Sequence, residues 1–264
     1  MVRTLLVRGM LAGLLAGLLA FGTARVLGEH WVDKAISFED YVEYNLHHQP
    51  HEMEIVSRNL QSSAGLGTGA IIYGVAFGGI FALVFAAAYG RIGTLTARGT
   101  AALLGLLGFV SVYLVPSLKY PPNPPSIGNP DTIGRRTSLY LILVVASVAM
   151  MVVAVVARRS LRHRFGEWNA TLLAGAGYLA MMALAYVVLP GINEVPQAAI
   201  PTVVHAVTDA GVTFPPTVLW RFRIGSLAIQ AAMWGGLALA FGPLAQRALE
   251  APRHGRPDRV DQPA

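Results

Sequence analysis

The chain has no cysteine among its 264 residues, and only 13% of its side chains are charged. Without cysteine it has neither a disulfide framework nor a metal site built from thiolates. A charged fraction this low, beside 54% hydrophobic residues, indicates an integral membrane protein, since soluble domains carry roughly twice as much charge. The middle of each long apolar segment also lacks aspartate, glutamate and histidine, which argues against a proton pump driven by buried carboxylates.

Catalytic motifs are missing as well. His51 and Glu52 are adjacent, but a zinc protease helix needs a second histidine at the position that Ile55 occupies. The sequence contains no glycine-rich phosphate loop ending in Gly-Lys-Ser/Thr and no Gly-x-Ser-x-Gly elbow. Its net charge of +6 comes from basic residues at the ends of apolar segments, without the basic, aromatic-rich face of a nucleic-acid groove. We therefore expect neither an enzyme nor a nucleic-acid-binding protein.

Six apolar segments, each close to the ~20 residues that cross a ~30 Å hydrocarbon core, fill most of the chain. They cover residues 5–27, 66–89, 100–118, 138–157, 170–189 and 224–244. Polar and apolar positions do not alternate in them, which excludes membrane β-strands, whereas helices satisfy their own backbone hydrogen bonds in lipid. The predicted fold is all-α: a polytopic transmembrane bundle over residues 1–250, followed by a disordered cytoplasmic tail at 251–264.

The first segment has two interpretations. Its short basic start, its apolar run and the small residues at 22–24 fit a cleavable signal peptide, and cleavage would leave five spans. Glycine also recurs at every fourth position, on one helix face where a second backbone can approach closely, at Gly9, Gly13 and Gly17. Because Gly74 and Gly78 offer a matching face on the second segment, we expect the first segment to be retained and packed.

The basic residues predict the topology. If the six segments alternate in direction, one side of the membrane receives Arg3, Arg8, Arg91, Arg98, Arg158, Arg159, Arg162, Arg164, Arg247, Arg253, Arg256 and Arg259. The positive-inside rule makes that side cytoplasmic, so we expect a multi-pass protein of the inner membrane with both termini in the cytoplasm. The other side has fewer basic residues, ten of the fourteen acidic ones, and long loops at 28–65, 119–137 and 190–223.

The first outer loop contains a group of potential metal ligands. His47, His48 and His51 lie within five residues of one another, and Glu52 follows them directly. Imidazole nitrogens and carboxylate oxygens suit borderline divalent ions such as Co²⁺, Ni²⁺ and Zn²⁺. Pro50 disfavours a regular helix through this stretch, so the spacing alone does not complete a site. Two interpretations stay open: a site that contacts metal, and a solvated acidic loop with incidental histidines.

Two neighbouring arginines on the outer side, Arg135 and Arg136, go against the charge rule. Arg135 and Arg136 follow a segment with prolines at 121, 122, 124 and 125, which favour a stiff extended chain at the mouth of the protein. We expect these two arginines to contact phosphate head groups or loop carboxylates. Arg221 and Arg223 precede the last span, and we expect them to pair with acidic residues.

Three stretches give the chain a family resemblance: VPSLKYPPNPPSIGNPDTIGRRT at 115–137, VLPGINEVP at 188–196 and FPPTVLWRFRIGSLAIQAAMW at 214–234. Together they resemble the CbtA family, cobalt transporter subunits of bacteria, over nearly the whole membrane portion. The resemblance implies cobalt uptake linked to cobalamin biosynthesis and a small single-span partner, CbtB, with a histidine-containing metal motif. It also implies about five spans, against the six counted here, and it assigns no binding residue.

The sequence thus predicts a membrane subunit that admits Co²⁺ from the outer side, with His47, His48, His51 and Glu52 gathering the ion. The expected partners are the lipid membrane, a divalent metal ion and a small single-span subunit of the CbtB type, with no permanently bound cofactor. The alternative from a different class is a membrane scaffold that transports nothing and assembles a metal-handling complex. Glycine-faced helices and an interior without buried charge suit the scaffold too.

Overall fold

The computed structural model describes residues 2–45, 55–125, 127–128, 130–192 and 214–250. The predicted metal ligands and the tail at 251–264 lie outside these residues. Helices make up most of the described chain, which shows the predicted all-α class. In chain order they are α1 (Val2–Leu27), α2 (Glu29–Asn45), α3 (Arg58–Leu60), the π-helical turn η1 (Gln61–Gly65), α4 (Leu66–Ala88), α5 (Ala97–Gly108), the π-helical segment η2 (Phe109–Leu114), α6 (Val115–Lys119), α7 (Pro130–Val188) and α8 (Pro216–Glu250).

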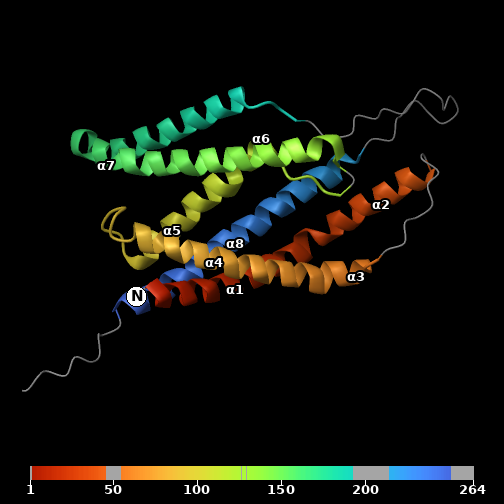
Figure 1. Ribbon diagram of the computed structural model, residues 1–264, viewed down its shortest axis with the longest axis horizontal. Coiled ribbons are helices and arrows are strands. Elements are labelled where there is room, and N and C mark those ends of the chain that lie inside the picture. The colour runs from red at the N-terminus through yellow and green to blue at the C-terminus, as the bar shows by residue number, and fades with distance from the viewer. Residues whose placement is uncertain (1, 46–54, 126, 129, 193–213, 251–264) are drawn as a thin grey trace, which may run out of the picture.

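Five helices in the described chain are long and apolar enough to cross a membrane. The fourth of them, α7, has 59 residues, which is far longer than one crossing requires. Gly166 breaks it with a left-handed backbone (φ 77°), a conformation that glycine adopts without steric cost. Figure 1 shows the two halves of α7 folded back on each other. This gives six membrane-length segments, as the sequence predicted.

The ends of the spans group as the sequence predicted. The N-terminus, the α4–α5 connection and the bend of α7 lie at one end of the bundle in Figure 1. Helices α2 and α3, together with the start of α8, lie at the opposite end, which we name the outer end after the topology that the sequence predicts. The arginine-rich segments and the acidic ones are therefore separated by the length of the spans.

The first, second, third and last spans pack into one core. Phe85 and Phe241 are fully buried in it, with ring centroids 5.0 Å apart in an edge-to-face contact. Phe81 adds a second edge-to-face contact to Phe241, at 5.5 Å. On the opposite side of the bundle α7 packs against η2 and α6, so the third span joins the two parts (Figure 1).

The glycine faces predicted for α1 and α4 meet in the structure. A Cβ atom added at Gly9, Gly13, Gly74 or Gly78 would collide with backbone atoms of the other helix. The two backbones are thus in direct contact, and α1 also packs along α8. The first apolar segment is a central helix of the fold.

The helices extend beyond the apolar segments of the sequence. The connection at 28–65, expected as a long loop, contains α2, α3 and η1. Similarly, α7 begins at Pro130, inside the expected loop at 119–137, and α8 begins at Pro216, inside the one at 190–223. Hydropathy marks where lipid contact ends, whereas polar residues continue a helix into water without difficulty.

Candidate functional site

All four predicted metal ligands, His47, His48, His51 and Glu52, lie outside the described residues. The structure does describe the two flanks of their segment. Helix α2 ends at Asn45 on one side, and Ile55 leads into α3 on the other. The positions of these flanks fix the two ends of the segment in space.

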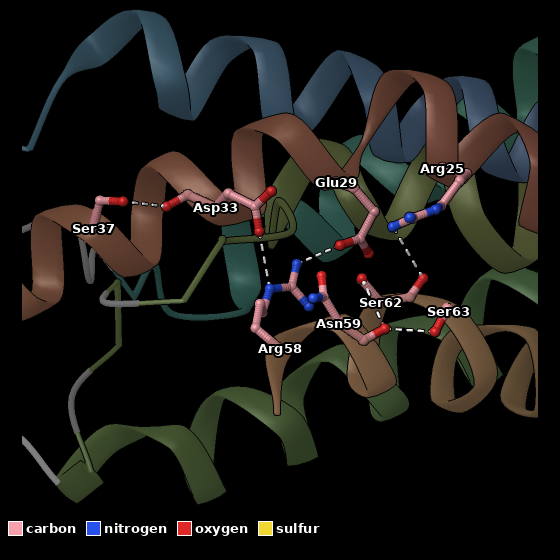
Figure 2. A network of polar contacts seen from close by, with 8 residues as sticks. All are labelled: Arg25, Glu29, Asp33, Ser37, Arg58, Asn59, Ser62 and Ser63. Atoms are coloured by element: carbon pink, nitrogen blue, oxygen red, sulfur yellow. Dashed lines mark hydrogen bonds and ion pairs between the residues drawn. The ribbon is translucent and has the colours of Figure 1, made fainter. Parts of the chain in front are cut away.

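One arginine joins α3, which follows the segment, to the start of α2, which precedes it (Figure 2). Arg58, the first residue of α3, donates from Nε to Asp33 Oδ1 at 2.9 Å and from Nη2 to Glu29 Oε2. Glu29 and Asp33 are four residues apart in α2, which places both carboxylates on one helix face. We call this arrangement the Arg58 clasp. It holds the start of α2 against the start of α3, so the two ends of the intervening chain, residues 34 and 57, lie close together.

The two arms of the clasp differ in exposure. The side chain of Glu29 is 13% exposed and that of Asp33 is 57% exposed, while Arg58 lies between them at 25%. Because solvent screens an ion pair less when the pair is shielded, the Glu29 arm contributes more than the Asp33 arm. A third contact, from Arg25 Nη1 to the Ser62 carbonyl at 3.4 Å, joins α1 to η1 beside the clasp (Figure 2).

The other face of α2 is apolar and packs against the bundle. Ala35 is fully buried there with Phe214 and Val218, which lie before and within the start of α8. Phe38 meets Phe214 edge to face, with ring centroids 5.1 Å apart. Trp31 packs against the same cluster and lies below the guanidinium of Arg221, 6.0 Å from ring centroid to Cζ. Helix α2 is therefore held on two faces, by the Arg58 clasp and by this cluster.

A pocket of about 200 Å³ lies elsewhere at the outer end, between the third span, the proline segment and the start of α7. Its lining residues are Tyr113, Ser117, Tyr120, Pro122, Arg136, Thr137 and Tyr140. Hydroxyl groups and one guanidinium therefore dominate its polar surface. It has no carboxylate or imidazole in its lining, so it offers none of the side chains that bind divalent transition metals best.

The two arginines beside this pocket bind the proline segment. Arg136 donates from Nη2 to the Pro121 carbonyl. Arg223 donates to the Pro122 carbonyl at 3.3 Å and to Asn123 Oδ1 at 3.0 Å. The expectation that Arg223 pairs with an acidic residue is therefore wrong among the described residues. Prolines supply no backbone N–H, so carbonyls of this segment need donors from side chains.

Three hydrogen bonds join the end of the third span to the end of α7, beside the pocket. Tyr186 donates its hydroxyl to the Val115 carbonyl, and Lys119 Nζ donates to the Tyr186 carbonyl at 2.8 Å. Tyr120 donates its hydroxyl to the Pro190 carbonyl at 2.7 Å. Burial raises the pKa of the Tyr120 phenol, and the charge of Arg135 lowers it in part. These bonds hold the outer ends of the two spans together.

Sequence reasoning missed both the pocket and the Arg58 clasp. No group of three or more metal-binding side chains occurs within the described ranges, and the predicted metal ligands at 46–54 lie outside them. The sequence did contain a signal for the clasp, because Glu29 and Asp33 have the spacing of two neighbours on one helix face. The pocket had none, since its walls come from segments that only the fold brings together.

A family model supports the resemblance noted in the sequence. The model described as "Probable cobalt transporter subunit (CbtA)" matches residues 2–246. No curated protein and no solved structure matches the chain.

Proposed function

This chain belongs to the CbtA family of probable cobalt transporter subunits, and from that membership we propose that it admits Co²⁺ from the outer side of the membrane. His47, His48, His51 and Glu52 gather the ion in this proposal, and Co²⁺ is the cargo. The membrane is the inner membrane, with both chain termini in the cytoplasm. A small single-span subunit of the CbtB type completes the transporter.

The observation that carries the proposal is the placement of the flanks of the histidine segment. The Arg58 clasp and the apolar face of α2 fix these flanks at the outer end of the bundle. Helix α2 also carries five acidic residues, at 29, 33, 39, 40 and 43, against Lys34 within it and Arg58 in the clasp, so this helix and its clasp keep a net negative charge. A cation is attracted to such a surface before it meets the imidazoles.

Imidazole binds a metal ion only in its neutral form. Because an ordinary histidine becomes protonated near pH 6.5, we expect capture of Co²⁺ to weaken below about pH 6. Ligand type alone does not select cobalt, since Ni²⁺ binds more tightly than Co²⁺ at most nitrogen and oxygen sites, and Zn²⁺ does so at many. The cobalt assignment comes from the family.

The test is uptake of Co²⁺, Ni²⁺ and Zn²⁺ by liposomes that contain the purified chain, with and without the single-span partner. The triple variant His47→Ala, His48→Ala, His51→Ala should reduce uptake at low cobalt and leave the protein level unchanged. His163→Ala is the matched control, because His163 is exposed and lies three residues before Gly166, at the bend of α7, which is at the opposite end of the bundle (Figure 1). Unchanged uptake by the triple variant would contradict the assignment of the histidines.

A scaffold is the second candidate, and one observation favours it. The buried polar side chains in the described chain are Ser62, Thr100, Ser111 and Ser147, with no charged group among them. Hydroxyl groups alone are the interior expected of packed helices that line no ion path. If no metal enters the liposomes with or without the partner, the scaffold becomes the better explanation.

A further inference from the structure

The pocket beside the proline segment lies apart from the histidine segment and has a different chemistry. Its guanidinium comes from Arg136 in α7, and its hydroxyls come from η2, α6 and α7 as well as from Tyr120. A volume of about 200 Å³ is small for an organic ligand and suits a compact polar group. The sequence predicted phosphate head groups or loop carboxylates as partners of Arg136, and the structure adds the pocket in which Arg136 lies.

Several of its hydroxyls are already used within the protein. Ser117 donates to the Leu114 carbonyl at 2.9 Å, and Thr137 donates to the Ile133 carbonyl at 2.8 Å. The hydroxyls of Tyr113 and Tyr140 differ, because neither bonds to a protein group in the part of the chain that the structure describes. The pocket therefore presents two phenol donors from two different spans to whatever occupies it.

The charges around the pocket are positive. Arg136 and Arg223 bind neighbouring carbonyls of the proline segment and are close enough for their charges to repel each other. In residues 115–140 and 214–226 the charged side chains are Lys119, Asp131, Arg135, Arg136, Arg221 and Arg223, five basic and one acidic. A cation is disfavoured here, and an anion would relieve the repulsion between the two guanidinium groups.

We propose that this pocket binds a phosphate group, with Arg136 as the charged donor and the hydroxyls of Tyr113 and Tyr140 as neutral donors. A guanidinium suits phosphate because its N–H groups match two phosphate oxygens at once. The start of α7, which lines the pocket, lies at the outer end of the bundle (Figure 1), so the phosphate can belong to a phospholipid head group or to a soluble phosphate. Both sources present the same chemistry to Arg136.

Two arms of one experiment separate these sources. In the first, the full chain is placed in nanodiscs of phosphatidylglycerol mixed with a glycolipid that has no phosphate, and lipid retained after mild delipidation is counted by native mass spectrometry. In the second, the delipidated chain in detergent is titrated with inorganic phosphate and its melting temperature is followed. Retention of phosphatidylglycerol over glycolipid identifies a head group, and saturable stabilisation by phosphate identifies a soluble anion.

Variants test the residues in whichever arm is positive. Arg136→Gln should lower phosphate-group binding at least about tenfold, as expected for loss of a charged hydrogen bond. Arg135→Gln is the matched control, since Arg135 is exposed and does not line the pocket. The double variant Tyr113→Phe, Tyr140→Phe keeps the shape of the pocket and should lower binding with unchanged helix content, which covers the case in which Arg136→Gln fails to fold.

Three results would overturn the proposal. The first is absence of phosphate-group binding in both arms. The second is equal loss of binding in Arg135→Gln and Arg136→Gln, which would indicate a diffuse surface effect. The third is full binding by a well-folded double tyrosine variant.

Discussion

Glu29→Gln should loosen the Arg58 clasp more than Asp33→Asn does. The substitution keeps the size of the side chain and removes its charge, so it weakens the shielded arm without opening a cavity. A hydrogen bond to a charged group contributes about 1.5–3 kcal/mol, and Glu29 is shielded enough for that range to apply. Asp33 is 57% exposed, and an exposed ion pair contributes about 0.2–1 kcal/mol, so Asp33→Asn should do much less.

Hydrogen exchange of the backbone at α3 measures this difference. The amides of Leu60 and Gln61 donate to the Ser57 carbonyl at 2.9 and 3.1 Å, next to Arg58, and exchange only when this turn opens. If the clasp holds the turn closed, Glu29→Gln should accelerate their exchange about 10- to 150-fold. Asp33→Asn should accelerate it about 1.5- to 5-fold.

A double-mutant cycle checks the cause. Once Arg58→Gln has removed the guanidinium, adding Glu29→Gln should change the exchange rate little, because the two groups act through one contact. Less than threefold acceleration in Glu29→Gln, or an effect of Asp33→Asn larger than that of Glu29→Gln, would refute the reasoning. Additive effects in the double variant would show that Glu29 acts through something other than Arg58.

Two further predictions concern packing and pH. Gly78→Ala should destabilise the protein by about 1–3 kcal/mol, because the added methyl group would collide with the backbone of α1. Gly69→Ala is the control, since its methyl group would enter open space and should not destabilise the protein. Denaturation in detergent measures the free energy of unfolding of both variants. Tyr120 has a raised pKa in the folded protein, so its neutral form stabilises the fold below the unfolded pKa of about 10, and this contribution is lost as pH rises through the folded value. The melting temperature should therefore drop less between pH 8 and pH 10.5 in Tyr120→Phe than in the wild type. An equal drop in the two proteins would contradict the role of this phenol.

The spans and the contact between α1 and α4 could be predicted from the sequence because each depends on a local pattern. Apolar length sets a membrane crossing, and glycine at every fourth position sets a close helix contact. Helix α2 was missed because its composition is mixed and its position lies between apolar segments. Its buried face at Trp31, Ala35 and Phe38 does have helical spacing, so periodicity within the polar connection would have revealed it.

The partners of the outer arginines could not be predicted from charge alone. Arg223 was expected to meet a carboxylate, and it meets the Pro122 carbonyl and Asn123 instead. The physical reason is local: four prolines in five residues leave this segment with few N–H groups, and its carbonyls take donors from nearby side chains. Which side chain is nearby depends on the fold, because Arg223 is 100 residues away from Asn123 in sequence.

The described interior also bears on the choice between a transporter and a scaffold. Ser111 already donates to the Leu107 carbonyl at 2.7 Å, and Ser147 is bonded to the Tyr178 hydroxyl at 2.8 Å. A divalent ion that leaves water loses a large hydration energy unless several ligands replace its water molecules, and no metal-binding group of three or more appears within the described residues. We therefore expect a transporter to draw ligands from residues outside the described ranges, such as 46–54 and 193–213, or from a second protein. Co²⁺ uptake should therefore fall when the three loop histidines are replaced, when the single-span partner is left out, or when Glu194, His205 and Asp209 are replaced. Saturable uptake by a chain that lacks all of these ligand sources would contradict this reasoning.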